Sequence, residues 1–96
     1  MKPRITISKN RKGEIEIFLN EPGRDLLVHY LKMLSETNDH IHLGSQEDES
    51  TEIPLQTMAY NANDEFLTWG KILFRPDKWD VEYFPHAFRE PEVPYA

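Results

Sequence analysis

The chain of 96 residues contains no cysteine. Disulfides, thiolate metal sites and cysteine nucleophiles are therefore excluded, and because small secreted domains usually need disulfides, we expect a cytoplasmic protein. No apolar run approaches the roughly 18 residues that a membrane span requires. No apolar stretch of the signal-peptide type follows Met1 either. These absences predict a single soluble domain over residues 1–96 with no membrane partner.

Basic residues are absent from the middle of the chain. Residues 36–65 carry eight acids and no Lys or Arg, whereas the first twelve residues carry five basic groups and no acid. An acidic surface repels nucleic-acid phosphates and attracts a basic protein, so we expect no nucleic-acid partner. The alternative is that these acids only keep a small protein soluble. The candidate partner-binding residues are Glu47, Asp48, Glu49, Glu52, Asp64 and Glu65.

Recognisable catalytic motifs are also missing. The chain has no phosphate-binding glycine loop and no H-E-x-x-H or G-x-S-x-G motif. A domain of this length has little room for a deep active site beside its core. We therefore expect a protein that is not an enzyme and has no catalytic residues and no cofactor.

The hydrophobic pattern predicts a β-hairpin followed by a helix and a strand. Residues 4–8 and 14–19 alternate in hydrophobicity around a turn with Gly13. Asn20 is a good N-cap for a helix whose leucine stripe runs to Leu34, and Thr37-Asn38 would end that helix. Residues 39–43 alternate again and predict a short strand.

The second half predicts two further strands. Residues 52–58 would form an edge strand because Pro54 lacks an amide donor, and residues 66–74 would form a central strand with a bulge or close contact at Gly70. The predicted fold is α+β, with one small antiparallel sheet, one main helix on one face, and the order β-β-α-β-(β)-β. Its expected core is Ile5, Ile7, Ile15, Ile17, Leu27, Leu31, Ile41, Leu43, Ile72 and Phe74.

Residues 77–96 form a tail rich in proline and aromatic residues. Pro85, Pro91 and Pro94 argue against a helix in this segment, while its large aromatic side chains argue that it packs on the domain. We expect the tail to lie in extended form across the sheet face opposite the helix. The alternative cover for that face is a second copy of the chain, which would make a homodimer.

His40 and His42 are the sharpest local feature. Two residues apart on a strand, they project to the same side and offer half of a metal site. No third ligand lies at a diagnostic spacing, so we expect hydrogen-bonded histidines on a half-exposed face and no metal. The alternative, from another functional class, is a small metal-dependent enzyme built on this pair. An adaptor domain that docks through its tail is a third hypothesis.

The run Asp39-His40-Ile41-His42-Leu43, with the later Lys71-Ile72-Leu73, resembles the bacterial immunity protein 32 family of polymorphic toxin systems. The resemblance covers about residues 3–75 and departs from the family in the loop 46–52 and after Arg75. It implies a non-enzymatic protein that neutralises a cognate protein toxin by tight binding. A toxin with a basic cleft for phosphates would suit the acidic residues named above.

Overall fold

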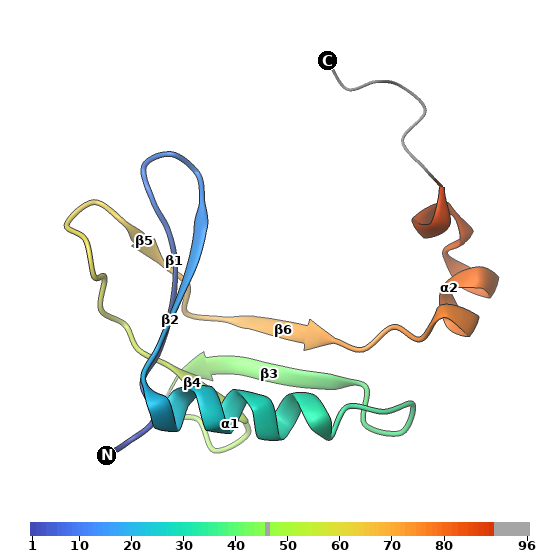
Figure 1. Ribbon diagram of the computed structural model, residues 1–96, viewed down its shortest axis with the longest axis horizontal. Coiled ribbons are helices and arrows are strands. Elements are labelled where there is room, and N and C mark those ends of the chain that lie inside the picture. Colours follow the sequence, from blue (N-terminus) through green and yellow to red (C-terminus); the bar gives the residue numbers. More distant parts are fainter. Residues whose placement is uncertain (46, 90–96) are drawn as a thin grey trace.

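The structure, a computed structural model, describes residues 1–45 and 47–89. The chain forms two short sheets and one main helix, which runs along the bottom of the view in Figure 1. In chain order the elements are β1 (Ile5–Lys9), β2 (Ile15–Leu19), α1 (Glu21–Lys32), β3 (His40–Ser45), β4 (Ile53–Leu55), β5 (Glu65–Phe66), β6 (Gly70–Leu73), α2 (Asp77–Tyr83) and the 3-10 helix η1 (Pro85–Phe88). The predicted α+β class is confirmed.

The hairpin and the main helix begin and turn where the sequence predicts. Gly13 takes a positive φ of 84° in the turn between β1 and β2, a conformation that glycine adopts without steric cost. The Asn20 side chain caps α1 by accepting from the N–H of Gly23 at 2.8 Å. The same oxygen accepts from the N–H of Arg4, also at 2.8 Å. Asn20 therefore ties the start of α1 to the chain just before β1.

The helix ends earlier than predicted, at Lys32. The Asn38 side chain donates to the carbonyl of Met33 at 3.0 Å, and the chain turns there. Glu36 consequently lies outside the helix, where it forms an ion pair with Lys78. This turn brings the chain directly into β3.

The strands divide into two sheets of three rather than one. The first has the order β2-β1-β5 and is antiparallel throughout; the second has the order β4-β3-β6, with β3 and β4 parallel and β3 and β6 antiparallel. The segment expected as one central strand, residues 66–74, supplies an edge strand to each sheet. The N–H of Leu67 still bonds to the carbonyl of Ile7 at 2.7 Å, and the chain then crosses to pair Gly70 with Leu43.

The core lies between β1, the second sheet and α1. Among the described residues, the buried hydrophobic side chains are Ile5, Ile41, Leu43, Ile53 and Leu55. Ile7, Leu26, Leu27, Tyr30, Leu34 and Ile72 pack around them while partly buried. Pro54 does place β4 at a sheet edge, but its two neighbours still face the core.

Three residues expected in the core are exposed. Ile15 and Ile17 are 59% and 55% exposed, and Leu31 is 43% exposed. The hairpin extends beyond the reach of α1, so only its base, at Ile5 and in part at Ile7, is covered by the rest of the core. The alternation along β2 identifies an apolar face correctly, but in the described part of the chain the part of that face formed by Ile15 and Ile17 is exposed.

The C-terminal part also differs from the expected extended tail. Residues 77–83 form α2, because Pro85 and the later prolines lie beyond it and do not interrupt its hydrogen bonds. In Figure 1, α2 and η1 stand away from both sheets, and the side chains from Val81 to Arg89 are exposed. Residues 90–96 lie outside the described residues, so packing of the complete tail stays a prediction.

Candidate functional site

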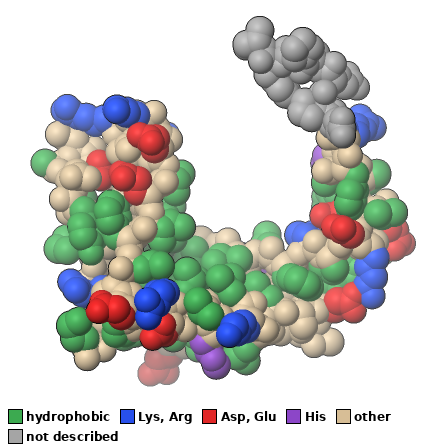
Figure 2. All heavy atoms as spheres, viewed as in Figure 1, with side chains coloured by type: hydrophobic (Ala, Val, Ile, Leu, Met, Phe, Trp, Pro, Cys, Tyr) green, Lys and Arg blue, Asp and Glu red, His purple; other side chains and the backbone are tan. Residues whose placement is uncertain are grey.

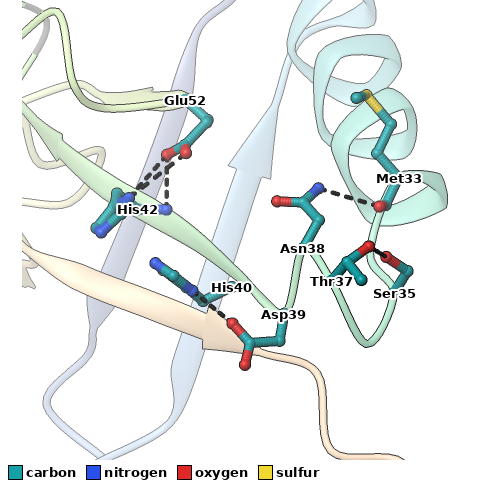
Figure 3. Close-up of polar contacts among 8 residues, drawn as sticks. All are labelled: Met33, Ser35, Thr37, Asn38, Asp39, His40, His42 and Glu52. Atoms are coloured by element: carbon teal, nitrogen blue, oxygen red, sulfur yellow. Dashed lines mark hydrogen bonds and ion pairs between the residues drawn. The ribbon is translucent and has the colours of Figure 1, made fainter.

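The two histidines lie where the sequence places them, on one face of β3. Ile41 between them points to the core, and the imidazole rings of His40 and His42 meet edge to face with centroids 4.8 Å apart. Each ring is held by a carboxylate through Nδ1: Asp39 lies 2.7 Å from His40, and Glu52 lies 3.1 Å from His42 (Figure 3). The family-motif residues Asp39, His40 and His42 therefore form one half-exposed cluster.

Glu52 connects this cluster to the loop before β4. One of its oxygens also accepts from the backbone N–H of His42 at 2.8 Å. Partial burial acts to raise the pKa of Glu52, but the hydrogen bonds from the His42 and Glu52 backbones and from the His42 ring outweigh it and lower the pKa. The hydrogen bond from His40 likewise lowers the pKa of Asp39. Both carboxylates are thus held in the ionised form.

The surroundings of the two histidines bear on the alternative of a metal site. Within residues 1–45 and 47–89, no three His, Cys, Asp or Glu side chains are grouped as metal ligands would be. The Nδ1 atoms of both histidines face carboxylates that orient their rings. The arrangement is that of two hydrogen-bonded surface histidines, and the absence of a bound metal in solution stays a prediction.

The acidic loop, residues 47–52, is ordered by its own side chains. Asp48 accepts from the N–H of Ser50 at 2.9 Å and from its hydroxyl at 2.7 Å, and these bonds lower the pKa of Asp48. Glu47 and Glu49 are exposed on either side of it. Two carboxylates of the acidic loop, those of Asp48 and Glu52, therefore hold its shape while two others face solvent.

The remaining predicted binding residues lie elsewhere. Asp64 and Glu65 lie at the far end of the hairpin, where Glu65 pairs across the strands with Lys9. Figure 1 shows the acidic loop below α1 and β5 beside the upper half of the hairpin. The structure therefore separates the six predicted acids into an acidic loop and a second pair beside basic residues.

A hydrophobic surface is the feature that the sequence reasoning missed. Large hydrophobic side chains of β2, α2 and η1 are exposed, and Figure 2 shows hydrophobic side chains along an open hollow in this view. The alternating hydrophobic pattern of residues 14–19 indicates that β2 has an apolar face. The pattern does not indicate whether other parts of the same chain cover that apolar face.

Comparison of the chain with protein-family models, curated proteins and solved structures finds no match. In the described part of the chain, neither α1 nor α2 has the length and apolar character needed to cross a membrane.

Proposed function

We propose that this chain is a non-enzymatic, cytoplasmic immunity-type protein that binds a cognate bacterial toxin through its acidic loop. The observation that carries the proposal is the ordered presentation of Glu47 and Glu49 by a loop whose shape is set by Asp48 and Glu52. A preorganised loop loses little conformational entropy on binding. Its charge suits a basic cleft built to hold phosphates.

The segments that carry the family resemblance support the same proposal. Asp39 to Leu43 and Lys71 to Leu73 lie far apart in the sequence, yet they pair as β3 and β6, with His42 opposite Lys71 and Ile41 opposite Ile72. A motif shared between two paired strands describes one structural unit. The acidic loop follows β3 directly, so that unit positions the proposed binding surface.

The test needs the toxin domain that the proposal implies, and a long toxin gene immediately upstream of this gene would supply it. We expect the double variant Glu47→Lys with Glu49→Lys to associate with that toxin domain about tenfold or more slowly at low salt, because electrostatic steering is reversed. The fold should survive, since both side chains are exposed and such charges contribute little to stability. The wild-type association rate should also fall as salt increases.

A matched control is Glu21→Lys with Asp25→Lys, which changes the net charge equally at two exposed acids of α1, outside the acidic loop. If both double variants slow association equally, the interface does not lie at the acidic loop. If the wild-type protein neither binds nor inhibits that toxin domain, the proposed immunity function itself is refuted.

A further inference from the structure

The hairpin and the C-terminal helices leave an open hollow between them. In Figure 1, β1 and β2 rise on one side, α2 and η1 stand on the other, and β6 runs between them. The outer edge of β6 has no strand partner among the described residues, since this sheet has the order β4-β3-β6. Open strand edges and apolar walls are features that proteins usually cover.

The hairpin has an apolar face that is exposed beyond its base. Ile15, Ile17 and Leu19 share this face and are 59%, 55% and 40% exposed. The opposite face is closed by the chain itself: Thr6 and Ser8 are buried there, and Phe18 stacks on Tyr60 with ring centroids 4.2 Å apart. The face that carries Ile17 is packed within the described chain only at its base, where Ile5 and Ile7 lie opposite Leu19 and Ile17 and join the core.

The second exposed apolar surface is that of the C-terminal arm, which we define as residues 75–89. Arg75 holds the arm together, because it bonds to Asp80 at 2.7 Å and lies 4.9 Å from the ring centre of Phe84 and 5.7 Å from that of Trp79. The arm still exposes much of its apolar surface, notably Val81 at 62% and Tyr83 at 67%. A helix as short as α2 is not stable alone in water, so the arm needs a surface to pack on.

The chain exposes more surface than a compact chain of its mass, and the excess is large enough for one side of a protein interface. The chain exposes 7498 Å², whereas a compact chain of its mass exposes roughly 5,800 Å². Its radius of gyration is 16.2 Å, against about 12.5 Å for a compact domain of this length. The excess of about 1,700 Å² is about twice the roughly 800 Å² that each partner buries in an interface of standard size.

We propose that a second copy of this chain fills the hollow, in a two-fold dimer in which the C-terminal arm of each copy packs on the exposed part of the hairpin face of the other. A second copy fits because each chain carries both an arm that lacks a packing surface and a face that lacks a cover beyond its base. Exchange between two copies satisfies both at once and closes the assembly. The acidic loop lies below α1, away from the hollow, so toxin binding and dimerisation use separate surfaces (Figure 1).

Sedimentation equilibrium of the purified full chain, without any toxin, tests the dimer. We expect a dimer with a dissociation constant on the order of 1 µM or tighter. Ile17→Lys on the hairpin and Val81→Lys on the arm should each weaken it about 100-fold or more, because each buries a charge in the interface. Val28→Lys, at a side chain 41% exposed on α1, should leave it unchanged. A wild-type chain that stays monomeric well above micromolar concentration would overturn the proposal.

Cross-linking tests which segments meet, and the absence of natural cysteine makes it specific. We expect a mixture of Ile17→Cys and Val81→Cys chains to form mixed covalent dimers on oxidation, whereas Val28→Cys paired with Val81→Cys should not. A single chain that carries both Ile17→Cys and Val81→Cys tests the competing arrangement, in which the arm packs on the hairpin of its own chain. If it forms mainly an internal disulfide and remains monomeric, the arm folds back on its own hairpin and the exchange is refuted.

Discussion

At the scale of single residues, the contact between Glu52 and His42 makes stability depend on pH. The pKa of Glu52 lies below its usual value of 4.5 in the folded chain, so the folded state binds fewer protons than the unfolded state near that pH. Its contribution to the free energy of unfolding is therefore fully present above pH 4.5 and is lost as the pH falls through the folded-state pKa.

Glu52→Gln removes this dependence while keeping an oxygen that accepts from the His42 N–H. We expect the variant to be less stable than wild type at neutral pH, and the difference to shrink as the pH is lowered below 4.5. Urea denaturation at a series of pH values measures it. Glu47→Gln, at an exposed carboxylate of the same loop, should show no such convergence. A constant difference between Glu52→Gln and wild type at every pH would contradict the prediction.

At the scale of elements, Gly23 decides how closely α1 approaches the start of the hairpin. A Cβ atom at this position would lie 2.7 Å from the carbonyl oxygen of Arg4 and 3.0 Å from Cγ1 of Ile5. Alanine is normally favoured over glycine in a helix by about 1 kcal/mol. Here we expect Gly23→Ala to lower the free energy of unfolding by about 1–3 kcal/mol, because the backbone at Arg4, just before β1, must shift.

Urea denaturation of Gly23→Ala and of Arg24→Ala shows whether the free energy of unfolding falls as expected. Arg24 is the next residue of α1 and is exposed, so its replacement should change stability by less than about 0.5 kcal/mol. A stabilised Gly23→Ala chain would show that α1 moves freely against β1. The close approach of the two elements would then not be a constraint.

Elements whose signals are local were predictable from the sequence. Gly13 in the turn and Asn20 at the helix start act on neighbouring backbone, so their effects can be inferred from the printed order of residues. Strand partners are different, because the parallel pairing of β3 with β4 and the division of residues 65–73 between two sheets depend on distant contacts. The same division explains the site: Glu65 pairs with β1, which places it away from Glu47 and Glu49.

At the scale of the whole molecule, the chain combines a small core with a large surface. The buried hydrophobic side chains in the described residues come from β1, β3 and β4, while much of β2 and α2 is exposed. Stability depends on the apolar surface removed from water, so a chain of this shape depends on what covers its hollow. In the proposed dimer, folding and association are therefore coupled.

That coupling predicts a denaturation midpoint that rises with protein concentration. For a dimer that unfolds to separate chains, each tenfold increase in concentration adds about 1.4 kcal/mol to the free energy of unfolding. We expect the thermal midpoint of the wild-type chain to increase steadily over a hundredfold range of concentration. The double variant Ile17→Lys with Val81→Lys should instead have a lower midpoint that does not vary, because it unfolds as a monomer. A wild-type midpoint that is independent of concentration while the dimer persists would mean that the chain folds fully before it associates, and that the hollow needs no cover for stability.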